Sequence, residues 1–205
     1  MKTRLLAVAT VCACAGMAHA IRVDLGVYEN ASNASLSGID LWVDVLDAPG
    51  PAIDFVFHND STASSFITAV YFETGLAGLS GGSIVDQSTG VSFNMGATPP
   101  NPAQPGFLFG GSWGGNLVSL DADNPSPTWG INEGGLETLT VRLNASGINA
   151  NGVAAAMLAD PREFRIAQHV QGLENGAFSV WSVTPAPGSL ALLGLGGLAA
   201  GRRRR

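Results

Sequence analysis

Two glycine-rich segments place a serine in the G-x-S-x-G pattern that marks the nucleophile of many hydrolases. They cover residues 78–82 and 110–114. A nucleophilic serine of this kind sits on a strand-to-helix turn and needs a histidine base. Neither segment is followed by a helical pattern, and beyond residue 20 the chain offers only His58 and His169 as a base. We therefore interpret both segments as glycine turns and keep a secreted hydrolase as an alternative.

Metal binding is a second chemistry that the side chains could support. The two histidines are far apart in sequence and lack the spacing of a zinc site. Calcium takes six to eight oxygen ligands and tolerates irregular loops, and Asp121, Asp123 and Glu133 supply carboxylates in one predicted loop. The EF-hand pattern fails there, because Ser126 and Asn132 stand where its glycine and glutamate belong. A polar turn is favoured, so we expect no cofactor and keep the three carboxylates as calcium candidates.

Carbohydrate chemistry would require either a carboxylate pair or exposed aromatic rings. Among the 16 acidic residues, Asp54 and Glu73 could face each other across neighbouring strands, but like charges directly opposite one another are normally avoided. We therefore expect no enzyme here. Four tryptophans could stack on sugars, although core packing is the stronger expectation for most of them: Trp42, Trp113, Trp129 and Trp181. The alternation around Trp42 predicts an outer sheet face. The first alternative function is a carbohydrate-binding module, either with or without a dependence on calcium.

The elements that would position these side chains are predicted to be short strands. Between residues 21 and 182, apolar and polar residues alternate with period 2 in short runs, as half-buried strands do. Strands are predicted at 21–28, 39–45, 53–58, 67–72, 83–86, 91–94, 116–120, 136–143, 164–171 and 177–180. Residues 151–159 are the only helical candidate. The pattern predicts an all-β fold, an antiparallel β-sandwich of jelly-roll type.

The intervening segments are predicted to be turns and loops. The longest are residues 98–105, which contain four prolines, and residues 121–135. Four Asn-x-Ser sequons are expected in surface turns: Asn30, Asn33, Asn59 and Asn144. The predicted domain holds all 16 acidic residues against four arginines and no lysine, a net charge of −12, whereas the whole chain carries −6. Because phosphate binding requires clustered cations, we expect no nucleic-acid partner.

Residues 1–20 have the organisation of a secretory signal peptide. Lys2 and Arg4 precede an apolar stretch, and Ala18 and Ala20 occupy the small-residue positions that signal peptidase requires. We expect a signal helix and cleavage after Ala20. Both cysteines of the chain lie in this segment, so the mature protein would have no thiol for a disulfide, a nucleophile or a metal.

The last residues, 183–205, contain three parts in a fixed order. A turn-forming segment comes first: Pro185, Ala186, Pro187 and Gly188. An uncharged apolar run follows over 190–201. The chain ends on four cations that would stop transfer across a membrane: Arg202, Arg203, Arg204 and Arg205. With its flanks, the apolar run approaches the lower length limit of a transmembrane helix.

This order resembles the PEP-CTERM sorting tail, in the variant with alanine between the two prolines. The resemblance implies an exosortase-type membrane protease as partner, which would cut near the Pro motif after a transient stay in the inner membrane. The protein would then reach the cell surface or the extracellular space, where extracellular polysaccharide is a further candidate partner. An ordinary tail anchor is the alternative for the same residues.

Parts of the middle region are similar to segments of the same group of proteins. Residues 55–60 and 65–73 resemble its F-x-F-x-N and S-I-T-x-V-Y-F strands, and residues 90–101 and 165–172 resemble later blocks. These motifs are structural and supply no site. The sequence thus predicts a signal peptide (1–20), an extracellular β-sandwich (21–182) and a sorting tail (183–205), with a function in display at the cell surface or in the extracellular matrix.

Overall fold

A computed structural model provides the structure of the protein. It describes residues 20–29, 35–98, 113, 115–159, 163–173 and 178–184. The expectations on the signal helix before Ala20, on most of the second serine segment and on the tail from Pro185 onward fall outside the described residues. Among the described residues, no helix is both long enough and apolar enough to span a bilayer.

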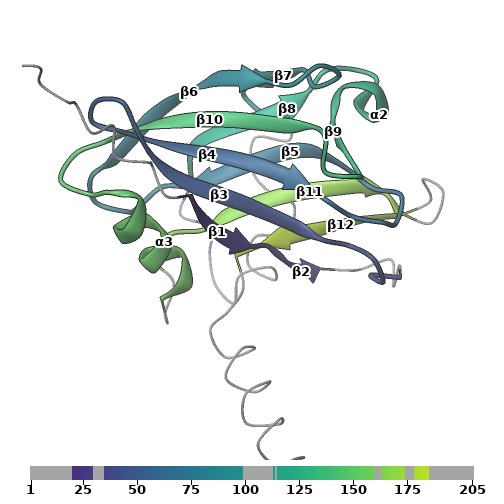
Figure 1. Cartoon of the computed structure of the whole chain (residues 1–205), viewed down its shortest axis with the longest axis horizontal. Helices are drawn as coiled ribbons and strands as arrows, with labels where there is room; N and C mark the ends of the chain where they lie inside the picture. Colours follow the sequence, from purple (N-terminus) through teal and green to yellow (C-terminus); the bar gives the residue numbers. More distant parts are fainter. Residues whose placement is uncertain are drawn as a thin grey trace, which may run out of the picture.

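Two antiparallel sheets pack against each other (Figure 1). The five-stranded sheet has the order β1 (Ile21–Asp24), β3 (Leu41–Ala48), β4 (Ala52–Asn59), β10 (Thr138–Ala145) and β6 (Leu79–Gln87). The seven-stranded sheet has the order β2 (Gly26–Glu29), β12 (Phe178–Val183), β11 (Ile166–Gly172), β5 (Phe66–Glu73), β8 (Asn116–Ala122) and β7 (Phe93–Met95), with β9 (Ile131–Asn132) also paired to β5. The prediction of an all-β antiparallel sandwich is confirmed.

The chain crosses between the sheets within its first described residues, so the expectation of one strand over 21–28 is wrong. β1 pairs with β3 in the five-stranded sheet, whereas β2 pairs with β12 in the other. The crossing lies at Leu25, whose backbone N–H donates to the Leu41 carbonyl at 2.8 Å. Local alternation is the same in both strands, so it carries no signal that the pairing partner changes.

Among the described residues, two helices accompany the sheets. The predicted helix is α3 (Ala150–Leu158), which begins at Asn149, where the side chain accepts a hydrogen bond from the Gly152 N–H. The expectation that it is the only helix is wrong, because the predicted loop 121–135 contains α2 (Ser126–Trp129) and β9. A single turn such as α2 is too short to show helical periodicity in the sequence.

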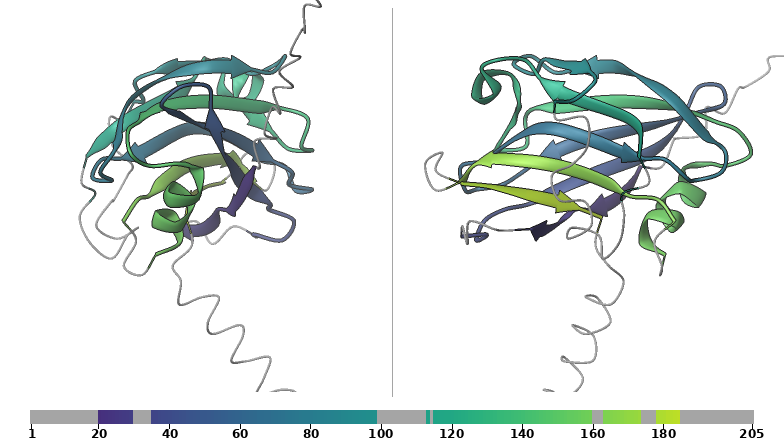
Figure 2. Two further views of the ribbon diagram at one scale, coloured as in Figure 1. Left: turned by 60° about the vertical axis from the view of Figure 1, so that its left-hand side comes forward. Right: turned by 180° about the vertical axis from the view of Figure 1, so that it is seen from behind.

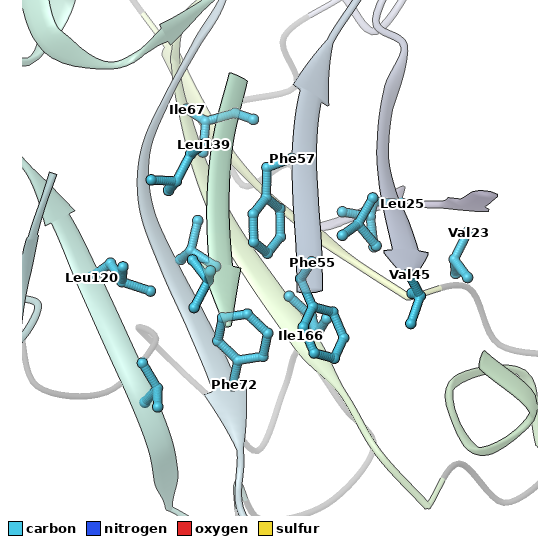
Figure 3. Packing of buried hydrophobic residues seen from close by; sticks show 14 of the residues in the cluster. Val23, Leu25, Val45, Phe55, Phe57, Ile67, Phe72, Leu120, Leu139 and Ile166 are labelled. Atoms are coloured by element: carbon cyan, nitrogen blue, oxygen red, sulfur yellow. The ribbon is translucent and has the colours of Figure 1, made fainter. Parts of the chain in front are cut away.

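The core lies between the sheets and is made by alternate residues of their strands. Phe55 and Phe57 of β4 point inward and meet Phe72 of β5 (Figure 3), with ring centroids 5.1 and 5.7 Å apart in edge-to-face geometry. All three rings are fully buried. Each such ring removes a large apolar area from water, which is the main stabilisation available to a domain without disulfides.

Candidate functional site

The last described strand lies directly in front of the predicted sorting motif. β12 is an interior strand, because it pairs with β11 on one side and β2 on the other. Val183 and Thr184 are 1% and 0% exposed, and the Thr184 N–H donates to the Ile166 carbonyl at 3.4 Å. The folded domain therefore extends to the residue before Pro185, and no flexible linker separates the two in the sequence.

The first described residues lie close to this junction. Ala20, the last residue of the predicted signal peptide, is exposed, and Ile21 already pairs with Val45. Gly26 pairs with Val183, so the segment that follows the predicted signal cleavage and the segment that precedes the predicted tail are neighbours in one sheet. The second predicted cleavage residue, Ala18, lies outside the described residues.

The outer face of the five-stranded sheet carries a cluster of four side chains, which consists of Trp42 and three neighbours. The Arg22 guanidinium carbon lies 4.0 Å from the centroid of the Trp42 ring. On the other side, the His58 ring stacks on Trp42 at a centroid distance of 4.7 Å and an angle of 10°. Asp44 Oδ2 lies 3.1 Å from His58 Nε2. The predicted outward position of Trp42 is confirmed.

This cluster leaves little room for sugar stacking on Trp42. β1 and β4 flank β3 on opposite sides, so the guanidinium of Arg22 and the imidazole of His58 cover the two faces of the indole. A sugar would have to displace one of them. The pKa of His58 is lowered because burial disfavours the charged ring, and the nearby Asp44 carboxylate opposes this only in part. The imidazole is therefore neutral at physiological pH.

The other tryptophans do not extend this face. Trp181 lies on the outer face of the seven-stranded sheet, where it packs with Tyr71 and is 7% exposed. Trp113 packs against the same cluster, and Trp129 ends α2 and is 38% exposed. The described structure therefore distributes the four tryptophans over both faces of the sandwich and one end, and no common stacking surface results.

His169 lies on the opposite outer face from His58, so the two histidines do not converge on a ligand. Its ring stacks on Trp181 at 4.7 Å and 20°, and its Nδ1 lies 3.1 Å from the Thr68 hydroxyl. Burial lowers the pKa of His169 to about 4. Both histidines are half-buried strand residues, as the alternation predicts.

The three calcium candidates act as hydrogen-bond acceptors for neighbouring loops. Asp123 accepts from Ser92 Oγ at 2.6 Å and from Asn94 Nδ2 at 2.5 Å. Asp121 accepts from the Thr98 N–H at 3.4 Å, and Glu133 accepts from the Ser65 N–H at 3.4 Å. Within the described ranges, no three His, Cys, Asp or Glu side chains are grouped so that they could hold a metal.

Asp54 and Glu73 do not face each other across neighbouring strands, because they belong to different sheets. Asp54 of β4 accepts two hydrogen bonds from Arg142 of β10, both at 2.7 Å. Glu73 of β5 forms a two-pronged ion pair with Arg165, at the start of β11. Sequence analysis missed both arginines as partners, since each lies about ninety residues away along the chain.

Two further sequence predictions concern the first serine segment and the sequon at Asn59. The first serine segment forms the start of β6, with Gly78 and Gly81 at φ of +91° and +40°, and a strand rather than a helix follows it. Only Gly78 lies in a turn and the other four residues belong to β6, so the interpretation as a turn holds in part, and the strand does not fit a nucleophile elbow. The sequon at Asn59 is not on the surface: Asn59 is fully buried and donates to the carbonyls of Ser65 and Ile131, each at 3.1 Å.

Comparison of the chain with known proteins adds no further identification. It matches no family model, no curated protein and no solved structure.

Proposed function

We propose that the chain is an exported, non-enzymatic β-sandwich protein that an exosortase-type membrane protease releases from a transient tail anchor. The observation that carries the proposal is the order of the last 21 residues: Pro motif, apolar run and four arginines. A signal peptide at residues 1–20 supplies the export that such a tail requires. In this proposal residues 190–201 form a short transmembrane helix and the arginines stay in the cytoplasm.

The position of the last described strand supports this division of the chain. The last described strand ends at Val183, and Thr184 completes its hydrogen bonding. Removing residues from Pro185 onward would therefore delete no strand and no core residue of the described domain. A processed protein would keep its fold and could be displayed at the cell surface or released into an extracellular matrix.

Intact mass of the protein recovered from the cell surface or medium tests the proposal. In a host that carries the exosortase-type enzyme, the mature chain should begin at Ile21 and end between Pro185 and Pro187. The same chain expressed without the enzyme should retain Arg205. The double variant Pro185→Ala/Pro187→Ala is the matched control, because it leaves the apolar run and arginines intact and should also stay unprocessed. A surface protein that still ends at Arg205 in the enzyme-containing host would refute the sorting function.

The carbohydrate-binding alternative makes a separate prediction. Since Arg22 and His58 cover the Trp42 ring, Trp42→Ala should leave any binding to a polysaccharide array unchanged. Binding that disappears in Trp42→Ala would instead favour the carbohydrate-binding module. The hydrolase alternative lacks a described nucleophile and base in contact. Strand β10 separates β6, which carries most of the first serine segment, from β4, which carries His58, and His169 lies in the other sheet.

A further inference from the structure

Only five residues, 185–189, connect the folded domain to the apolar run. An extended chain spans at most about 3.6 Å per residue, so Leu190 lies within roughly 20 Å of Thr184. The eight-residue strand β4 alone is about 26 Å long, at about 3.3 Å per residue. If residues 190–201 lie in a bilayer, the domain therefore cannot stand clear of the membrane. The part of the domain around Thr184 must face the lipid surface.

Helix α3 belongs to this part of the domain. The Glu163 N–H donates to the carbonyl of Ala156 in α3 at 3.2 Å, and β11 begins three residues later at Ile166, whose carbonyl binds Thr184. In Figure 1 and in the right-hand view of Figure 2, the arrowhead of β12 points toward the side of the molecule where α3 lies. The exposed surface of α3 and the exit of the tail are therefore close together.

The exposed face of α3 is unusual for a helix on the surface of an acidic domain. None of its nine residues is charged. Asn151, Ala155 and Leu158 are exposed, Leu158 to 45%, and their spacing of four and three residues places them on one side of the helix. A surface helix normally carries charged residues on its solvent side. An uncharged, partly apolar side indicates a neighbour other than bulk water.

The connections beside α3 share this lack of charge. The turns at 48–51, 74–78 and 145–149 contain no charged residue. They form one surface, because the Ala145 N–H donates to the Pro51 carbonyl and the Ser146 N–H to the Gly78 carbonyl, both at 2.8 Å.

Few charges border this surface in the described structure. Asp47 is an exposed carboxylate that accepts a hydrogen bond from the Ala150 N–H at 2.7 Å, and Arg165 neutralises Glu73. Glu163 is exposed.

The opposite end of the sandwich is acidic. The connections at 36–40, 60–65 and 123–137 meet there through the bonds from the Asp60 N–H to the Asp40 carbonyl and from the Glu133 N–H to the Ser65 carbonyl. They carry five carboxylates, of which only the first is shown paired with an arginine, Arg22, at 3.0 Å: Asp40, Asp60, Asp123, Glu133 and Glu137. Anionic lipid headgroups repel carboxylates. The acidic charge is thus concentrated on the end that is distant from α3.

We infer that the α3 end of the sandwich lies against the lipid bilayer while the protein is anchored, with Asn151, Ala155 and Leu158 on the membrane surface and the acidic loops pointing away. The inference rests on the proposed function, because it requires the tail to be in the membrane. One exposed leucine buries too little apolar area to hold the domain there alone, so contact depends on the tail.

Single-cysteine labelling tests this orientation. In the full chain, Cys12→Ser and Cys14→Ser leave no thiol, and Leu158→Cys then adds one for an environment-sensitive fluorophore on α3. Leu136→Cys is the matched control, since Leu136 is a 90% exposed leucine at the acidic end. Each protein is reconstituted in phosphatidylcholine vesicles that contain headgroup-labelled quencher lipids. The label at position 158 should lose most of its fluorescence, and the label at position 136 should keep nearly all of it.

Vesicle flotation in the same samples distinguishes a wrong orientation of the domain from the absence of a tail anchor. If the chain floats with the vesicles but both labels escape quenching, the orientation is wrong and the tail anchor stands. If the chain does not float, the anchor itself is wrong, and the orientation with it. If the label at position 158 becomes shielded without vesicles as the protein concentration rises, α3 binds a second copy of the chain, which would also overturn the inference.

Discussion

The two sheets use the same antiparallel geometry but differ in what covers them. In the five-stranded sheet, β3 and β4 alternate strictly between buried and half-buried residues over most of their length. In the seven-stranded sheet, seven consecutive residues of β5, from Ile67 to Glu73, are buried. A strand buried on both faces must have packing on both sides of its sheet. The five-stranded sheet therefore has a core face and an open face at β3 and β4, whereas the seven-stranded sheet is covered on both faces at β5.

The second covering of the seven-stranded sheet is a small apolar cluster on its outer face. Its members are Ala69, Tyr71, Ala97, Ala167, Trp181 and Val183, with Trp113 packed against them. Burial in this cluster raises the pKa of Tyr71 to about 12, mainly by desolvation. The same sheet carries polar groups on its inner face, where Gln168 and Ser182 are fully buried. In the seven-stranded sheet, residues on the outer face are thus not always exposed to solvent, and residues on the inner face are not always apolar.

The test with the largest expected effect on stability compares one tryptophan from each outer face. Trp181→Ala removes a ring that is 7% exposed and should lower the free energy of unfolding by about 3–5 kcal/mol. Trp42→Ala removes a half-buried ring with one imidazole and one guanidinium contact and should cost about 1 kcal/mol. Urea unfolding of both variants measures the two values. Equal losses would mean that the outer faces are energetically alike.

A second test uses the histidine on each outer face. The pKa of His169 is about 4 in the folded protein and about 6.5 in the unfolded chain, so between these values the unfolded chain binds the extra proton. Stability should therefore fall as the pH drops from about 6.5 toward 4, by up to roughly 3 kcal/mol.

His169→Asn should flatten this pH dependence relative to the parent protein when urea unfolding is measured between about pH 7 and about pH 4.5. The control is His58→Asn. The pKa of His58 is also lowered by burial, but Asp44 opposes the shift, so this variant should change the slope less. An unchanged slope in His169→Asn would show that this histidine is not protected from protonation.

The smallest expected effect concerns the inner face of the seven-stranded sheet. Neither amide atom of Gln168 has a hydrogen-bond partner among the described residues. A buried polar group without a partner costs about 1–3 kcal/mol, so the similarly sized Gln168→Met should stabilise the domain by about 1 kcal/mol in thermal or urea unfolding. Gln171→Met, on the same strand but half-buried, should be nearly neutral. A loss of stability in Gln168→Met would indicate that the amide is satisfied in solution.

Sequence reasoning succeeded where the signal is local. The alternation around Phe55 and Phe57 predicted an inward-facing strand, and helical spacing followed by Asp160-Pro161 predicted α3 to within one residue at each end. It failed where two distant segments meet. It supplied no partner for Asp54 or Glu73, because each pairs with an arginine about ninety residues away along the chain. The sequon at Asn59 predicts a surface turn, because this local pattern contains no information about the loops that bury the side chain.

The same distinction applies to the candidate sites. The sequence by itself determined the strand pattern, the acidic composition and the order of the tail, since each is written in consecutive residues. Only the tertiary structure decided that Arg22 and His58 enclose Trp42, that the calcium candidates accept hydrogen bonds from residues 92–98 and from Ser65, and that the acidic loops gather at the end opposite α3. These depend on which strands become neighbours, and pairing is chosen by the combined burial of all strands rather than by any one segment.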